Sequence, residues 1–157
     1  MTPDAEAPMA LQSRLEAAAR DAMRARDERR TTTLRMALAA AHNQRIARGR
    51  ELTDEEVTEV IGREVKQRRE SIEIYRGAGR EDRAASEEAE VAILAEFLPE
   101  QLSDVEIETL ARAAIGETGA SGPADIGKVM GRVAPATKGR ADGRRVSDIV
   151  RRLLTDA

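Results

Sequence analysis

The sequence contains no cysteine and no tryptophan, and it has a single histidine, His42, in 157 residues. Without thiols the chain forms no disulfide, no thiolate metal site and no cysteine nucleophile. One histidine also excludes most zinc sites and Ser-His-Asp arrangements. We interpret His42 as a surface or packing residue. We therefore name no catalytic residue and no metal ligand, and we expect no cofactor.

Aromatic residues are almost absent as well. They make up 1% of the chain, as Tyr75 and Phe97, whereas 41% of the residues are hydrophobic. The core must therefore consist of Leu, Val, Ile, Met and Ala, which favours packed helices over sheets. No segment approaches the ~20 apolar residues of a membrane span, and residues 1–10 do not resemble a secretory signal. These features predict a cytoplasmic protein without membrane contact.

Charge is distributed unevenly along the chain. The formal net charge is −3, but residues 81–124 carry 2 basic and 11 acidic side chains, and residues 125–157 carry 8 basic and 4 acidic ones. An overall pI near 5.4 argues against a general nucleic-acid binder. The basic C-terminal segment is suited either to a local anion-binding patch or to a solvated helical face.

Apolar residues at three-and-four spacing predict helices almost everywhere from Leu11 onward. We expect two helices before Gly49, separated at the threonines of positions 31–33. A third helix begins at Thr53-Asp-Glu-Glu56, which has the pattern of a capping box. Its run "VKQRRES" is interpreted mainly as a solvated face.

The remaining helices follow the same signals. A fourth helix starts near Glu81 and stops at Pro99, and a second capping box opens at Ser103. Two short helices complete the chain, the first closed by Pro135 and the last capped by Asp142. We therefore predict an all-α fold with a disordered segment at 1–10, a four-helix N-terminal domain at 11–98 and a three-helix C-terminal domain at 99–157.

One stretch, "GPADIGK", has the spacing of a nucleotide-binding loop, but its context is wrong for one. Such a loop needs a preceding strand and a Ser or Thr after its lysine. Here Val129 follows Lys128, and Pro123 lacks a backbone N–H. Gly127 and Gly131 are instead interpreted as small residues that let another backbone approach their helix.

A second stretch, Lys138-Gly-Arg-Ala-Asp142, places cations beside the start of the last helix, with two arginines in its first turn. Cations at a helix N-terminus face the unfavourable end of the helix dipole, so a bound anion would fit there. Together with cations of the preceding helix they form the predicted phosphate-binding set: Lys128, Arg132, Lys138, Arg140, Arg144 and Arg145.

These residues also carry a family resemblance. The stretch "GKVMGRVAPATKGRADGRRVSDIVRRLL" resembles the C-terminal tail shared by the GatB subunit of tRNA-dependent amidotransferases and stand-alone YqeY proteins. "TLRMALAAAHNQRIARGRELTDEEV", "EVKQRRESIEIYRGAGREDRA" and "LAEFLPEQLS" resemble YqeY itself, so the likeness covers about residues 11–155. It implies a two-part helical fold whose C-terminal domain is GatB-tail-like and helps to hold tRNA.

Three functions are consistent with these features. The first is a non-catalytic tRNA-binding module, or an accessory to a tRNA-modifying or aminoacylation-linked enzyme. The second is a protein-interaction adaptor whose acidic region, residues 81–124, meets a basic partner. The third is a component of a glutamine-dependent amidotransferase, a carbon–nitrogen ligase with glutamine as amido-N-donor. Because both aromatic residues lie on predicted core stripes, any RNA would be recognised by shape and phosphate. The sequence does not indicate an oligomeric state.

Overall fold

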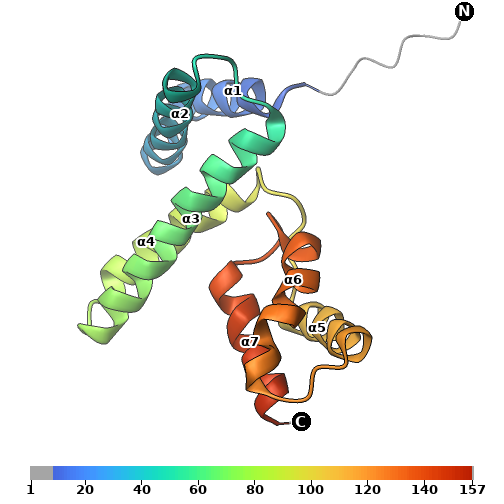
Figure 1. Ribbon diagram of the computed structural model, residues 1–157. Helices are drawn as coiled ribbons and strands as arrows, with labels where there is room; N and C mark the ends of the chain where they lie inside the picture. The colour runs from blue at the N-terminus through green and yellow to red at the C-terminus, as the bar shows by residue number, and fades with distance from the viewer. Residues whose placement is uncertain (1–8, 157) are drawn as a thin grey trace, which may run out of the picture. The chain divides into compact units, whose positions relative to one another are not determined.

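The computed structural model describes residues 9–156, and this part of the chain is all-α, as the sequence predicts (Figure 1). Residues 1–8 of the expected disordered segment lie outside the described residues. No helix within the described range is long and apolar enough to cross a membrane. The elements are α1 (Leu11–Arg24), α2 (Glu28–Arg48), α3 (Asp54–Gly77), α4 (Glu81–Ala95), α5 (Asp104–Thr118), the 3-10 helix η1 (Pro123–Asp125), α6 (Ile126–Thr137) and α7 (Gly143–Thr155).

The chain divides into two compact units, the first ending at Leu98 and the second beginning at Pro99. The N-terminal unit holds α1 to α4, and the C-terminal unit holds α5 to α7. Each unit has its own aliphatic core. The largest fully buried side chains of the first are Leu15, Leu34, Ile61, Leu94, Val57 and Thr33, and those of the second are Ile107, Leu154, Val129, Val133, Val146 and Val150.

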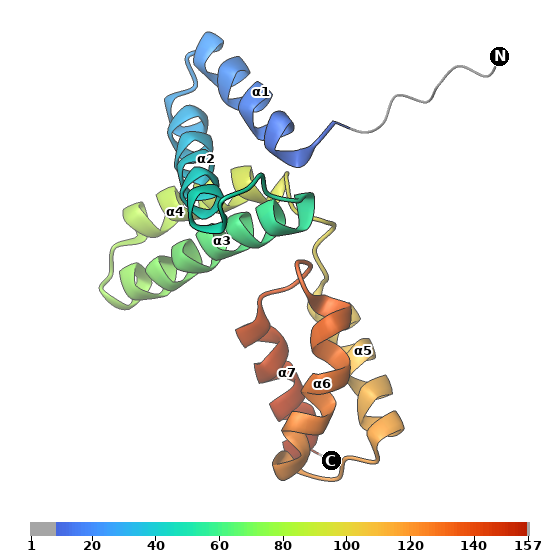
Figure 2. The ribbon, with the colours of Figure 1, turned by 45° about the horizontal axis from the view of Figure 1, so that its top comes forward.

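In the N-terminal unit, α3 and α4 lie side by side as a helical hairpin, and α1 contacts α2 at an angle (Figures 1 and 2). Helix α2 also contacts α3 and α4, so it joins the two pairs. Short side chains such as Ala19 and Ala37 are buried at these contacts. Small residues let helix axes approach closely, which compensates for the lack of large aromatic rings.

Helix α2 begins earlier than the sequence predicts. The chain breaks at residues 25–27, and the threonines at 31–33 lie inside the helix. The Asp27 carboxylate accepts a hydrogen bond from the Arg30 backbone N–H at 3.0 Å, which caps the helix. The hydroxyl of Thr31 donates back to the Asp27 carbonyl at 2.7 Å, and Thr33 is fully buried. The capping aspartate therefore outweighs the weak helix propensity of the threonine run.

Both predicted capping boxes are confirmed. The Glu56 backbone N–H donates to the Thr53 hydroxyl at 3.2 Å, and the Glu56 carboxylate accepts from the Thr53 backbone N–H at 3.3 Å. Ser103 and Glu106 repeat the arrangement at α5. Helix α1 has no such residue of its own, and Asp54 of α3 instead accepts from the Leu11 backbone N–H at 3.0 Å.

Arg68 departs from the predicted solvated face of α3, because it is only 6% exposed. Its guanidinium pairs with Glu64 at 2.9 Å and with Glu90 of α4 at 3.3 Å. A third nitrogen lies 3.8 Å from the sulfur of Met36 on α2. Arg68 therefore ties α3 to both α2 and α4 through a charge that is shielded from water.

In the C-terminal unit, α5, α6 and α7 pack on one another in all three pairings. Helix α6 continues two residues beyond Pro135, so the prediction that proline closes this helix is wrong. The buried Thr137 hydroxyl donates to the Val133 carbonyl at 3.1 Å in this last turn. The helix ends at Thr137 with Lys138 as its C-cap, after which Gly139 adopts the left-handed conformation with φ of 75°.

Replacing Arg68 by alanine should destabilise the N-terminal unit by about 3 kcal/mol, because two shielded carboxylates lose their counter-charge. The matched control is Arg69→Ala, since the neighbouring Arg69 is less buried than Arg68, and it should change stability by less than about 0.5 kcal/mol. Urea denaturation followed by circular dichroism measures both. Equal stabilities of the two variants would contradict the role given to Arg68.

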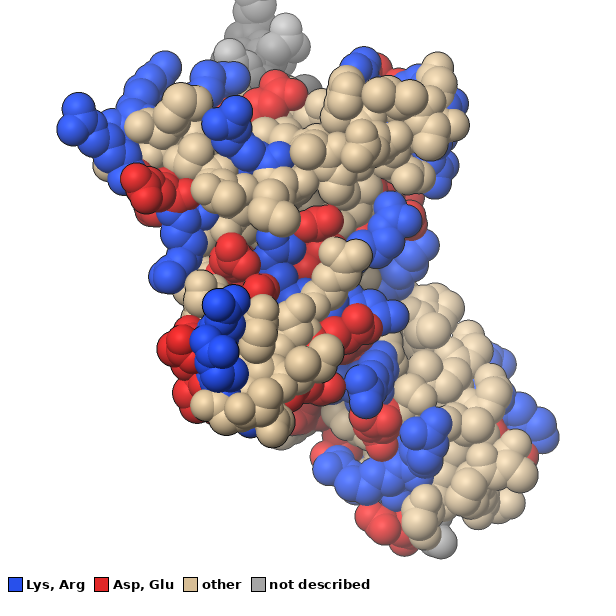
Figure 3. All heavy atoms as spheres, turned by 90° about the vertical axis from the view of Figure 1, so that its left-hand side faces the viewer, with Lys and Arg blue, Asp and Glu red and all other residues tan. Residues whose placement is uncertain are grey.

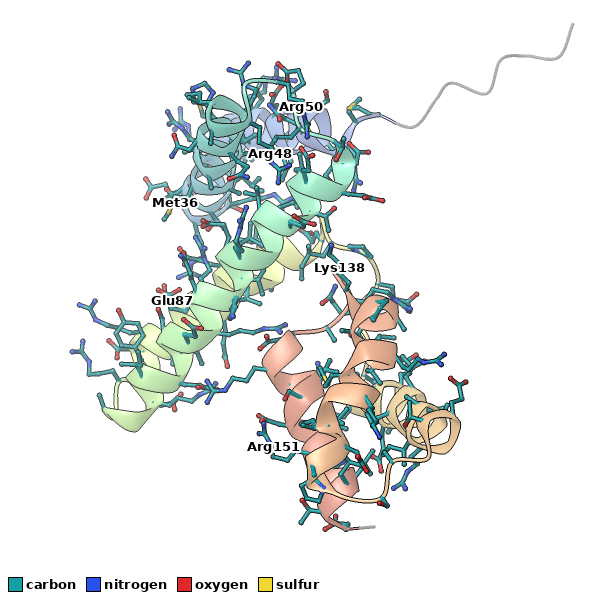
Figure 4. The ribbon with its side chains drawn as sticks, in the orientation of Figure 1. Met36, Arg48, Arg50, Glu87, Lys138 and Arg151 are labelled. Atoms are coloured by element: carbon teal, nitrogen blue, oxygen red, sulfur yellow. The ribbon has the colours of Figure 1, made fainter. Side chains whose placement is uncertain are left out.

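A second test uses Glu87 of α4, whose pKa is raised by burial first and by the neighbouring Glu90 carboxylate second, with Arg68 opposing (Figure 4). The folded chain then binds this proton more tightly than the unfolded chain does. The free energy of unfolding should therefore fall as pH rises from the ordinary glutamate pKa through the raised value. Glu87→Gln should be more stable than the parent at neutral pH and should lose this dependence. If the melting temperatures of the parent and of Glu87→Gln follow the same pH profile, the raised pKa of Glu87 does not affect stability.

Candidate nucleic-acid interface

The loop that carries the predicted phosphate-binding residues, 138–142, is held in place by the segment before α5. The Leu102 backbone N–H donates to the Arg140 carbonyl at 2.8 Å, and the Gln101 amide donates to the Gly139 carbonyl at 3.1 Å. The Arg140 guanidinium donates to the Glu100 carbonyl at 3.3 Å. This loop is therefore an ordered connection that hydrogen bonds fix to the segment before α5.

Asp142 caps α7, as the sequence predicts. Its carboxylate accepts a hydrogen bond from the Arg144 backbone N–H at 3.3 Å, and α7 begins at Gly143. The cap uses one of the otherwise unpaired N–H groups of the first turn. The apolar face of α7, which starts at Val146, is thereby aligned with the C-terminal core.

Helix α6 exposes a face of small residues. Gly127, Gly131, Ala134 and Pro135 are all exposed, and a Cβ atom built on either glycine would meet nothing within 4 Å. Within the described residues, no other backbone of this chain therefore approaches these glycines. Because such a surface lacks protruding side chains, it lets an external molecule lie close to the helix backbone.

Two predicted cations, Lys128 and Arg132, lie one turn apart beside this small-residue face of α6. Both are strongly exposed, at 69% and 64%. Lys128 pairs with Asp125 at 3.6 Å, and Arg132 pairs with Glu117 at 3.8 Å. A hydrogen bond from the Ser121 backbone N–H lowers the pKa of Asp125, with Lys128 adding to the effect. These pairs are long and accessible to water, so each contributes little stability.

The other four predicted cations differ in how they are held. Arg145 pairs with Asp104 of α5 at 2.5 Å, which joins the starts of α7 and α5. Arg140 is half-buried and bonded to a backbone carbonyl. Lys138 and Arg144 are exposed, and each has an interaction partner as well. Arg145 and Arg140 therefore stabilise the structure through these contacts. The Lys138 side chain is exposed at the start of the loop (Figure 4).

Carboxylates that the basic sequence segment does not reveal face these cations. Residues 99–157 contain nine basic and nine acidic side chains, so the C-terminal unit has no net charge. Figure 3 accordingly shows blue and red side chains interspersed on the face in view. The basic segment at 125–157 is balanced by acidic residues of α5 and of the loops around it, which lie far away in sequence. Any attraction of an anion is therefore local and short-ranged.

Stacking and metal chemistry have no visible basis in the described residues. Phe97 is buried, and both aromatic rings lie beside arginines, Phe97 at 5.8 Å from Arg14 and Tyr75 at 5.9 Å from Arg83. His42 is exposed and lies 3.2 Å from an Arg45 nitrogen. Within residues 9–156, no group of three or more His, Asp or Glu side chains is arranged to hold a metal ion.

Comparisons with known proteins match the chain to a family model and to relatives in two organisms. A family model described as Yqey-like protein matches residues 12–154. Altered inheritance of mitochondria protein 41, mitochondrial, of Pyrenophora tritici-repentis is 31% identical over 144 residues, which are 90% of this chain and 79% of the relative. An uncharacterized protein of Schizosaccharomyces pombe is 32% identical over 85 residues, which are 54% of this chain and 69% of the relative.

The cap of α7 provides a test of this geometry. Asp142→Ala should lower the free energy of unfolding by about 1 kcal/mol, because the first turn of α7 loses its side-chain acceptor. Asp148→Ala, an exposed change in the middle of the same helix, is the matched control and should have a smaller effect. Thermal unfolding followed at 222 nm measures both variants. A control that destabilises as much as Asp142→Ala would show that the cap has no special role.

Proposed function

The chain belongs to the family of YqeY-like proteins, and from this premise we propose that it is a non-catalytic RNA-binding accessory module that contacts tRNA through its C-terminal unit. The contact surface is the exposed face of α6 together with the loop before α7. Phosphates would lie against Lys128, Arg132 and Lys138. The accessory role would be to hold tRNA for a tRNA-modifying or aminoacylation-linked enzyme.

One observation supports this proposal above the others, namely the position of two loosely paired cations beside the glycine face of α6. Lys128 and Arg132 face carboxylates at 3.6 and 3.8 Å, in pairs that water reaches freely. Exchanging such a pair for a phosphate contact costs at most about 1 kcal/mol. The adjoining glycines add no side chains that would keep a sugar-phosphate backbone at a distance.

The proposed recognition is one of shape and phosphate. The zero net charge of residues 99–157 supplies no long-range field, so a moderate and strongly salt-dependent affinity is expected. The buried Phe97 and the arginine-covered Tyr75 offer no platform for unpaired bases. Folded RNA such as tRNA therefore suits this surface better than single strands do.

Amidotransferase chemistry is not part of the proposal. A glutaminase usually needs an activated nucleophile, and the chain has no cysteine and only the exposed His42. Cytoplasmic location remains a prediction, because the name of the Pyrenophora relative assigns that protein to mitochondria.

The proposal is tested by replacing Lys128 and Arg132 together by alanine. Each neutralised phosphate contributes roughly 0.7–0.9 to the slope of log affinity against log salt concentration. The double variant should therefore bind tRNA more weakly and flatten that slope by about one to two units. Filter binding or fluorescence anisotropy with total tRNA, repeated at several salt concentrations, measures both quantities.

The matched control is the double variant Arg151→Ala and Arg152→Ala. These arginines of α7 are 60% and 56% exposed and also pair with carboxylates, so the control removes the same charge from the same unit. It should retain most of the salt slope. If both double variants behave alike, or if neither differs from the parent, the surface of α6 is not the RNA contact and the adaptor function replaces this proposal.

A further inference from the structure

The outward face of α2 has an unusual composition for the solvent side of a surface helix. Its exposed residues recur at helical spacing and include two large apolar side chains, Met36 at 50% and Ile46 at 63% exposure. The solvent side of such a helix normally carries charged and polar residues. We call this surface the outer α2 face and define it by Thr32, Arg35, Met36, Ala39, Asn43 and Ile46.

The outer α2 face also carries little negative charge. No Asp or Glu occurs from position 29 to position 50, so Glu28, exposed in the first turn of α2, is the one acidic residue of this helix. Arg35 is exposed and forms no ion pair with any residue between 9 and 156. This face is therefore largely apolar and carries an exposed cation that has no ion pair in the described range. An acidic, partly apolar partner complements it.

One apolar side chain of this face is held in position by the ionic network beneath it. The Met36 sulfur lies 3.8 Å from an Arg68 nitrogen, and Arg68 is itself fixed by Glu64 and Glu90. In Figure 4, Met36 projects from the outer edge of α2. A side chain that is exposed yet already positioned loses less entropy when a partner covers it.

We propose that the outer α2 face docks an acidic amphipathic helix of a partner protein. Met36 and Ile46 are about 15 Å apart along the axis at 1.5 Å per residue, which matches apolar anchors about three turns apart on a packed helix. Ala39 lies between them and leaves space for the partner's side chains. Arg35 pairs with a carboxylate of the partner.

RNA suits this face less well. Phosphates require closely spaced cations, whereas the outer α2 face presents one arginine among Met, Ala and Ile side chains. Methionine and arginine are enriched in protein interfaces. The inference is independent of RNA binding by the C-terminal unit, so either proposal can fail alone.

The experiment pans a display library of helical peptides of about 18 residues against the full chain. Enriched peptides should carry apolar residues at three-and-four spacing together with Asp or Glu. A synthetic copy of an enriched peptide should bind the Ile46→Glu variant about tenfold more weakly or worse. The matched control is Ile74→Glu on α3, where the isoleucine is 69% exposed, and it should bind as the parent does.

Two further variants make the result specific. Arg35→Glu should favour basic peptides over acidic ones, because the charge of the site is reversed. Ala39→Gln adds bulk without charge in a helix-compatible side chain, so it should also weaken peptide binding. This variant serves as the test if Ile46→Glu fails to fold. Circular dichroism verifies helical content in each case.

Several outcomes would overturn the proposal. The first is that the enriched peptides lack acidic residues. The second is that an enriched peptide binds the Ile46→Glu variant as tightly as it binds the parent. The third is that the chain self-associates and that Ile46→Glu abolishes this self-association. Competition between tRNA and the peptide, together with loss of tRNA binding in Arg35→Glu, would instead identify the outer α2 face as an RNA contact.

Discussion

The shortage of aromatic residues constrains the whole structure. With Phe97 as its one buried ring within residues 9–156, the protein buries short aliphatic side chains, and these fill space only when helices lie close together. Alanines at positions such as 37, 41 and 111 are buried for this reason. Two separate cores result, one for α1 to α4 and one for α5 to α7. With 35% of its residues charged, the chain must then place most of these charges at the surface.

The two units treat their cations differently. In the C-terminal unit, basic and acidic residues are equal in number, and cations such as Arg145 and Lys128 face carboxylates of neighbouring elements. In the N-terminal unit, exposed arginines such as Arg50 and Arg76 also face carboxylates, but Arg68 is buried between helices and Arg35 lacks an ion pair among the described residues. The proposed phosphate contact and the proposed docking of a partner helix therefore use different units.

Much of the fold could be predicted from the sequence because its signals are local. The apolar stripes, the capping boxes at Thr53 and Ser103 and the aspartate cap of α7 each depend on residues within one or two turns. Errors arose where two local signals competed. The threonines at 31–33 suggested a break, but Asp27 provided a stronger helix start, and α6 tolerated Pro135 in its last turn.

The sequence by itself determined the helical class, the number of helices and the absence of a thiol-based site, since these follow from composition and short-range pattern. Only the tertiary structure decided which charges remain available. Arg68 belongs to a polar run in the sequence but is enclosed by α2 and α4, and Arg132 and Arg145 of the basic tail pair with Glu117 and Asp104, which lie outside that tail in the sequence. Met36 and Ile46 belong to an apolar sequence but lie on the outside of α2. Burial and pairing depend on residues that meet only after folding, and a helical period cannot specify which face another helix will cover.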